Sequence, residues 1–236
     1  MAEQIWAMKH GDIPMTVTVT ITSDFICPWC LIGERRLEQA ITRLPEGVNV
    51  QLKWRPFELN PEMPGEGMDR KIYRSLKFGS WERSQQLDAQ TVAAARDDAV
   101  AFNYASIKRT PSTLLAHRLM ALAEENGLAT PVAKSVFSAY FEQGRDVGCA
   151  SILADIAEEN GLERESVAAF LASDAGTDQI RASQWAQQAE GIRSVPLFDI
   201  EGEIIGGAQS VDTFEAALLK ASGKNGDCAD GVCTIA

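Results

Sequence analysis

Two cysteines lie two residues apart in the segment Cys27-Pro28-Trp29-Cys30. A cysteine thiolate can attack a disulfide, and a second thiol close by can then displace the mixed disulfide that forms. The pair follows residues 16–22, which alternate β-branched apolar and polar side chains as a strand does. It precedes residues 31–41, whose apolar side chains recur at helical spacing. The sequence therefore predicts a reversible disulfide at the point where a strand leads into a helix.

Pro28 indicates where that helix begins. Proline has no backbone N–H and a preset φ, so it suits the first helical position and places Cys27 at the N-cap or just before it. Free N–H groups and the positive end of the helix dipole stabilise a thiolate there. We therefore expect the pKa of Cys27 to lie below its usual value of about 8.5. Cys30, one turn into the helix, is expected to be buried and to stay a thiol, so Cys27 attacks and Cys30 resolves.

Half of a zinc site, or a plain structural pair, would also explain two cysteines at this spacing. A redox pair is the form expected near a strand–helix–strand unit, whereas zinc knuckles usually sit in tight turns. We therefore expect the pair to be redox-active and the chain to hold no metal.

The composition excludes several classes of protein. The chain has 236 residues and a net charge of −11, from 33 acidic and 22 basic residues. This balance argues against partners that are nucleic acids or anionic membrane surfaces. The first 14 residues lack the apolar core of a signal peptide, and no stretch approaches the ~20 apolar residues of a spanning helix. We expect a cytoplasmic protein with a disordered lead over residues 1–14.

The rest of the chain predicts a small sheet domain divided by helices. Residues 48–54 alternate as a second strand, and later strands are expected at 191–200 and 203–207, joined by a Glu201-Gly202 turn, before a helix at 211–221. Between them strand patterns nearly vanish. Helices are predicted there at 81–102, 114–126, 130–141, 149–160, 163–173 and 177–188. The fold class is thus α/β, with β-α-β, a large all-helical insertion, then β-β-α.

This order sets the expected domains. Residues 15–60 and 190–221 form one α/β domain, residues 61–189 form the helical insertion, and residues 222–236 form a flexible tail. The two flanks can share a sheet only if they meet in space. The strand that ends at the cysteines and the strand at Val195-Pro196 should therefore be neighbours.

The β-α-β … β-β-α order with Cys-x-x-Cys at the first helix resembles the thioredoxin fold. The large helical insertion resembles the DsbA family of thiol–disulfide oxidoreductases. The match covers about residues 15–221. Four segments together look like the FrnE-like branch of that family: residues 27–30, 116–119 (Ala-His-Arg-Leu), 194–198 (Ser-Val-Pro-Leu-Phe) and 206–210 (Gly-Gly-Ala-Gln-Ser).

The resemblance implies roles for residues around the cysteines. Pro196 is expected to be a cis-proline facing the disulfide, and the Val195 backbone is expected to pair with a substrate strand. Pro28 and Trp29 complete the expected substrate-binding set. The reaction needs no cofactor beyond the redox-active disulfide, with glutathione as a candidate co-substrate. Its partners would be a protein or small-molecule disulfide and a cellular thiol reductant.

Trp29 departs from DsbA itself, where a histidine between the cysteines helps to hold the thiolate. A neutral, apolar residue cannot do this, so we expect a less oxidising couple. In a reducing cytosol the net reaction of this couple would be disulfide reduction or isomerisation.

Cys228 and Cys233 form a second pair that is similar to an extra pair in some FrnE-like proteins. The Asp-Gly between them is a turn dipeptide that can bring the two sulfurs together. The pair could relay electrons to Cys27 and Cys30, form a passive disulfide, or join them in a zinc site.

The remaining cysteine, Cys149, is expected to be a small buried residue. His117 is expected to be a packed or surface residue of a helix, with a place in the substrate groove as the functional alternative.

Two other functions stay open. Kappa-class glutathione transferases and hydroxychromene carboxylate isomerases share this architecture, and there a serine is the usual residue at the position of Cys27. The presence of Cys30 and of the tail pair favours an oxidoreductase over such a glutathione-dependent enzyme. A non-enzymatic chaperone or metal-binding module is the third possibility.

Overall fold

The computed structural model describes residues 15–223. The predicted lead over residues 1–14 and the tail cysteines Cys228 and Cys233 lie outside the described residues. Every helix within residues 15–223 is too short or too polar to cross a lipid bilayer.

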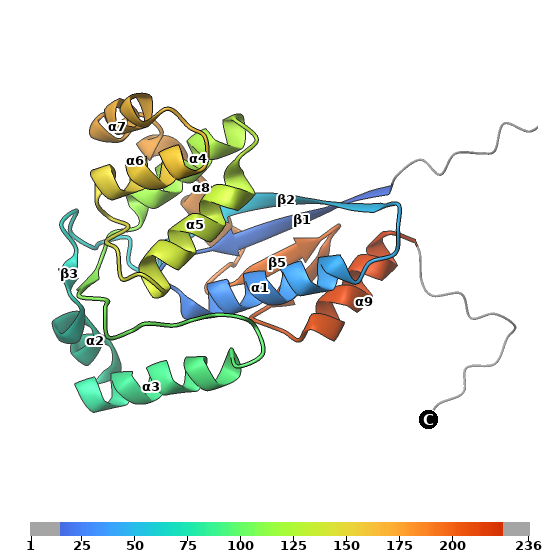
Figure 1. Ribbon diagram of the computed structural model, residues 1–236, viewed down its shortest axis with the longest axis horizontal. Coiled ribbons are helices and arrows are strands. Elements are labelled where there is room, and N and C mark those ends of the chain that lie inside the picture. The colour runs from blue at the N-terminus through green and yellow to red at the C-terminus, as the bar shows by residue number, and fades with distance from the viewer. Residues whose placement is uncertain (1–14, 224–236) are drawn as a thin grey trace, which may run out of the picture.

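A four-stranded sheet organises the fold (Figure 1). Its strands are β1 (Met15–Ser23), β2 (Val48–Pro56), β5 (Leu197–Ile200) and β6 (Glu203–Gly206), in the order β2-β1-β5-β6. β1 runs parallel to β2, and β5 is antiparallel to both β1 and β6. Ile21 of β1 pairs with Phe198 of β5. The prediction that the two flanks of the chain meet in one sheet is therefore confirmed.

Two helices pack together with one face of this sheet. Helix α1 (Pro28–Thr42) and helix α9 (Val211–Ala221) contact each other, as Figure 1 shows. Alternation in β1 turns Val17, Val19 and Ile21 toward a single core, where they meet Leu37 of α1 and Phe214 of α9. Burial of these apolar side chains fixes α1 on the sheet and so fixes the cysteines at its first turn.

The expected helical insertion is present between β2 and β5. Its elements are β3 (Met68–Asp69), α2 (Arg70–Phe78), α3 (Trp81–Ala94), β4 (Arg109–Thr110), α4 (Leu114–Glu125), α5 (Ala129–Phe141), α6 (Ala150–Glu159), α7 (Arg164–Ala172) and α8 (Thr177–Ala189). Helices α4 to α8 gather at the end of the sheet where β1 stops and α1 begins (Figure 1). Phe25, Cys27 and Cys30 belong to the same core as α4 and α5. The cysteine pair therefore lies at the junction of sheet and helices.

The prediction of one helix over residues 81–102 is wrong in its second half. Helix α3 ends at Ala94, and in Figure 1 the chain then turns back beneath α1. Strand β3 and helix α2 precede α3, and strand β4, which pairs with β3, follows it. None of these three elements was predicted. The helical pattern continues past Ala94, but the tertiary contact described next takes precedence over it.

Arg36 of α1 holds the chain where α3 ends. Its Nε and Nη2 atoms both lie 3.0 Å from the carboxylate of Asp98, which is 4% exposed. The same guanidinium donates to the carbonyls of Ala94 at 2.7 Å and Ala208 at 2.8 Å. One side chain thus ties the cysteine-bearing helix to the insertion and to the loop before α9.

Gly33 lets α1 lie close to β5. A Cβ atom at this position would lie 2.8 Å from Cζ of Phe198 and 3.4 Å from Cγ of Pro196. Contacts under 3.0 Å do not occur without a shift of one partner. Glycine is therefore required by the close approach of the helix to the strand.

We predict that Arg36→Ala lowers the free energy of unfolding by about 3 kcal/mol, because it leaves the buried Asp98 carboxylate without its cation. Urea unfolding at neutral pH measures the change. Arg43→Ala at the C-cap of the same helix is the matched control, since Arg43 pairs with Asp212 and Glu215 at the surface. Such exposed ion pairs contribute little to the free energy of unfolding. An Arg36→Ala variant no less stable than Arg43→Ala would contradict the assigned role.

Candidate active site

Helix α1 begins at Pro28, and Cys27 is its N-cap residue, as the sequence predicts. Cys27 has extended backbone angles, φ −92° and ψ 112°, and its carbonyl accepts the N–H of Cys30 at 3.0 Å. Its own N–H donates to the carbonyl of Asp24 at 3.1 Å. The thiol therefore sits at the start of the helix, at the positive end of the helix dipole.

Asp24 shapes the turn that leads to Cys27. It is 0% exposed, and its carboxylate accepts the N–H of Leu59 at 2.7 Å and of Ile26 at 3.5 Å. His117 is packed rather than superficial. It is 3% exposed, with Nε2 lying 3.8 Å from the Asp24 carboxylate and 3.2 Å from the Phe57 carbonyl oxygen. These contacts join the cysteine turn to the loop after β2 and to α4.

The Val195-Pro196 segment lies against the first cysteine. The peptide bond between these residues is cis, which confirms that prediction. The thiol of Cys27 donates to the carbonyl oxygen of Val195 at 3.8 Å. The two segments that the sequence singled out are therefore in contact, although they lie far apart along the chain.

Cys30 is the more deeply buried of the two cysteines. It is 2% exposed, against 6% for Cys27 and 40% for Trp29 between them. Burial raises the pKa of Cys30 well above 9.0, and its hydrogen bond and charge interaction with Cys27 act in the same direction. The backbone of Asp24 and the hydroxyl of Ser23 oppose this rise in pKa. Cys30 is therefore a thiol at neutral pH, as expected from the sequence.

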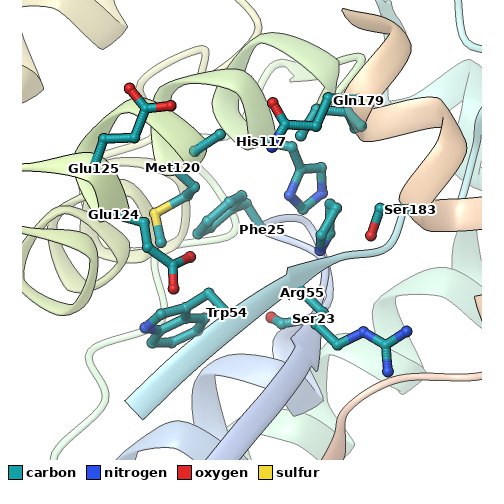
Figure 2. Close-up of a pocket in the computed structure, with 13 residues that line it drawn as sticks. Ser23, Phe25, Trp54, Arg55, His117, Met120, Glu124, Glu125, Gln179 and Ser183 are labelled. Carbon is teal, nitrogen blue, oxygen red and sulfur yellow. The ribbon is translucent and has the colours of Figure 1, made fainter. Parts of the chain in front are cut away.

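Two cavities flank the cysteine turn. The first, called here the front cavity, has a volume of about 300 Å³ and opens beside Cys27, between the cysteine turn and helices α2 and α3. The second, called here the rear cavity, has a volume of about 320 Å³ and lies behind the turn, between β1, β2, α4 and α8 (Figure 2). Neither cavity can be deduced from a sequence motif, because each is lined by segments that are far apart in the chain. The front cavity has the following residues in its lining: Cys27, Pro28, Trp29, Tyr73, Lys77 and Phe78.

The front cavity carries more positive than negative charge. Among the described residues that line it, the cations are Arg74 and Lys77 and the acid is Asp88. The Asp88 carboxylate is already shared, since Arg70 and Arg74 each donate to it at 2.7 Å. Lys77 donates to the hydroxyl of Tyr73 at 2.6 Å. This excess of cations contrasts with the net charge of −11 of the whole chain.

Cys149 differs from its prediction. It is the N-cap residue of α6 and is only partly buried, because that position lies at the surface end of the helix. Hydrogen bonds from the Ser151 side chain and from the backbone of Ile152 and Ser151 lower the pKa of Cys149.

Within residues 15–223 no group of three or more His, Cys, Asp or Glu side chains is placed to hold a metal ion.

Comparison with known proteins places this geometry in a family. The model of the DSBA-like thioredoxin domain matches residues 18–219. The chain belongs to the DSBA-like thioredoxin domain family.

Relatives of this DSBA-like chain agree with that assignment. An uncharacterized protein of Bacillus subtilis (strain 168), YwbO, is 32% identical over 205 residues, which are 86% of this chain and 96% of YwbO. The crystal structure of the probable DsbA oxidoreductase SCO1869 from Streptomyces coelicolor is 29% identical. It superposes with a TM-score of 0.79 and covers 93% of this chain and 94% of that one.

The fold is also shared with a 2-hydroxychromene-2-carboxylate isomerase. That structure is 15% identical and has a TM-score of 0.67, with 90% of this chain and 100% of that chain covered. By family and by its paired cysteines, the chain is a DsbA-like oxidoreductase.

We predict that iodoacetamide modifies Cys149 much faster than Cys30 at neutral pH. The raised pKa keeps Cys30 protonated below about pH 9, so its alkylation should increase only when the pH rises above that value. The measurement uses peptide mass spectrometry on a reduced Cys27→Ser variant, in which modification of Cys27 cannot obstruct Cys30. Equal rates for Cys30 and Cys149 at neutral pH would contradict the assigned burial and protonation state.

Proposed function

We propose that this protein is a dithiol–disulfide oxidoreductase in which Cys27 is the nucleophile and Cys30 the resolving cysteine. The observation that carries the proposal is the position of Cys27, at the start of α1, in the lining of the front cavity and in contact with the Val195 carbonyl. Cys30 lies one turn behind it as a thiol. The arrangement supplies one accessible sulfur and one protected sulfur, which a two-step exchange requires.

The reaction balances without a bound cofactor. Cys27 attacks one sulfur of the substrate disulfide, releases the first substrate thiol and becomes part of a mixed disulfide. Cys30 then attacks the Cys27 sulfur, releases the second substrate thiol and closes the Cys27–Cys30 disulfide. The protein loses two electrons, the substrate gains two, and two protons pass to the released thiols. A cellular thiol reductant restores the dithiol.

Pro28, Trp29, Val195 and Pro196 form the proposed contact surface for the substrate. Trp29 is the most exposed residue of the cysteine turn and can cover an apolar part of the substrate. The Val195 carbonyl already accepts a hydrogen bond from Cys27, so it is positioned to accept one from the backbone of an incoming chain. Protein and small-molecule disulfides both fit this surface.

The charge of the front cavity favours anionic disulfides. Arg70 and Arg74 share the single negative charge of Asp88, so one positive charge is left over there in addition to that of Lys77. These charges would attract a substrate with carboxylates, such as oxidised glutathione or an acidic peptide. A volume of about 300 Å³ suits a small ligand rather than a large cofactor.

Finer assignments stay predictions. They are membership of the FrnE-like branch, a cytoplasmic location, and a relay role for Cys228 and Cys233. The neutral Trp29 favours a less oxidising couple than that of DsbA and therefore reduction or isomerisation as the net reaction.

The alternative is a glutathione-dependent isomerase or transferase of the kappa-class or hydroxychromene carboxylate isomerase type. The front cavity beside Cys27, with its cations, favours this second candidate because a bound glutathione would fit there. Such an enzyme has no need of Cys30.

Substitution of each cysteine separates the two candidates. We predict that Cys27→Ser abolishes the reduction of insulin or of oxidised glutathione. In the Cys30→Ser variant Cys27 should still attack the substrate disulfide, but the Cys27 mixed disulfide should accumulate, which intact-mass spectrometry detects. Cys149→Ser is the control and should keep full activity. Full turnover by Cys30→Ser together with tight binding of glutathione would support the isomerase or transferase instead.

The charge preference has its own test. Lys77→Gln should raise the KM for oxidised glutathione about threefold, a typical effect of one partly screened charge. It should leave the reduction of uncharged 2-hydroxyethyl disulfide unaltered. Lys71→Gln, at an exposed position of the same helix outside the cavity lining, is the matched control. It should alter neither the KM for oxidised glutathione nor the reduction of 2-hydroxyethyl disulfide. Equal effects of Lys77→Gln on both substrates would point to a structural role instead.

A further inference from the structure

The rear cavity is a space that the proposed reaction does not use. It shares no lining residue with the front cavity, and neither cysteine of the pair belongs to its lining. Its volume of about 320 Å³ is in the range of small-molecule sites. Phe25 and Trp54 give it aromatic walls, and Met120 and Ile180 add further apolar surface. Walls of this kind favour a ligand with an apolar, flat body.

One face of α4 carries polar groups at two separate points of this cavity. Four side chains at helical spacing project from that face into the lining: His117, Met120, Ala121 and Glu124. The helix rises about 10 Å between His117 and Glu124, so these two residues stand at opposite ends of an apolar stretch. Figure 2 shows the His117 ring and the Glu124 carboxylate both directed from α4 toward the strands.

The His117 ring presents an unused polar atom at one end. His117 is 3% exposed, and its Nε2 atom lies 3.2 Å from the Phe57 carbonyl oxygen. A carbonyl oxygen only accepts hydrogen bonds, so Nε2 carries the hydrogen, and Nδ1 of the neutral ring is an acceptor. Nδ1 makes no hydrogen bond to any group in residues 15–223, and it is not fully enclosed by protein atoms. A ligand with a hydroxyl or N–H at this end would complete it.

The other end of the stretch is anionic. Glu124 and Glu125 are exposed at the mouth of the cavity, and neither forms an ion pair with any group in residues 15–223. The Arg55 guanidinium in the lining donates to Glu190 at 3.0 Å, which offsets its charge. Figure 2 shows the Glu124 side chain pointing toward Trp54 and that of Glu125 pointing away. A carboxylate that faces an aromatic ring attracts an ammonium group by charge and by cation–π interaction.

We propose that the rear cavity binds an elongated organic monocation. Its ammonium group would lie at the Glu124 end, its apolar body over Met120, and a hydroxyl or N–H at the His117 end. With a hydrogen bond of about 3 Å at each end, a molecule of the size of phenylethylamine spans the two side chains. The inference goes beyond the oxidoreductase function and does not depend on it, because this ligand is distinct from the disulfide substrate.

The probe is tyramine, which has an ammonium group, an aromatic ring and a hydroxyl at the far end. Three relatives each change one feature: phenethylamine lacks the hydroxyl, 4-ethylphenol lacks the ammonium group, and 3-(4-hydroxyphenyl)propionate has a carboxylate in its place. Each is titrated into the reduced, isotope-labelled full chain, and NMR of the tryptophan indole N–H groups reports binding and its location. The signal of Trp54, identified by its loss in Trp54→Phe, should shift. That of the exposed Trp185, outside the lining, should not.

The ligand series and three variants give the expected result. Tyramine should bind about tenfold more tightly than 4-ethylphenol and about threefold more tightly than phenethylamine, and the propionate should not bind. Glu124→Gln should weaken tyramine binding about fivefold and leave 4-ethylphenol binding unaltered, because it removes only the charge. His117→Gln keeps an N–H toward the Phe57 carbonyl and should reduce the affinity for tyramine to that for phenethylamine. Ala121→Phe fills the cavity and should abolish the binding of every ligand.

Glu158→Gln is the matched control for Glu124→Gln. The sequence Ala-Glu-Glu-Asn-Gly-Leu occurs at residues 123–128, at the end of α4, and again at residues 157–162, at the end of α6. Glu158 therefore has the same local setting as Glu124 and is also exposed, but it lies outside the cavity lining. Its substitution should leave the affinity for tyramine unaltered.

Three outcomes overturn the inference: a Trp54 signal that tyramine leaves in place, equal affinities for tyramine and 4-ethylphenol, or equal effects of Glu124→Gln and Glu158→Gln. If His117→Gln does not fold, the comparison of tyramine with phenethylamine in the parent protein tests the same contact, and equal affinities for these two would overturn the role of Nδ1.

Discussion

The contact between the Cys27 thiol and the Val195 carbonyl is the constraint on which the arrangement of the site depends. It joins residues 168 positions apart, so no local element can create it. The pairing of β1 with β5 brings the two segments to the same end of the sheet. The packing of α1 then fixes the sulfur in one place against that end. The helical insertion extends around this contact and supplies the walls of both cavities.

The α/β core was predictable because its signals are local or nearly so. Pro28 fixes the start of α1, and alternation fixes β1, so the position of Cys27 as N-cap follows from a few residues. The end of α3 was not predictable in the same way. Residues 95–102 have a helical pattern, but the chain leaves the helix to place Asp98 against Arg36, which lies 62 residues earlier. Helix propensity is a weak preference that such a contact overrides.

Within the candidate site, the reacting residues carried sequence signals and their surroundings did not. Cys27, Cys30 and Pro196 belong to motifs, whereas the walls of the two cavities come from segments far apart in the chain. The rear cavity is walled by β1, β2, α4 and α8, whose mutual packing no single segment encodes. The cations of the front cavity were hidden for the same reason, since α2 was not expected.

The close approach at Gly33 has a consequence for how this site can diversify. The distance between α1 and β5 is set by the absence of a side chain, with Phe198 and Pro196 directly opposite. A single added carbon would lie 2.8 Å from Cζ of the fully buried Phe198, so either that ring or the helix would have to move. Trp29 lies outside this contact and is 40% exposed, so its chemistry can change without rebuilding the scaffold. The fold thereby separates a position that determines dimensions from a position that determines reactivity, so the two can change independently.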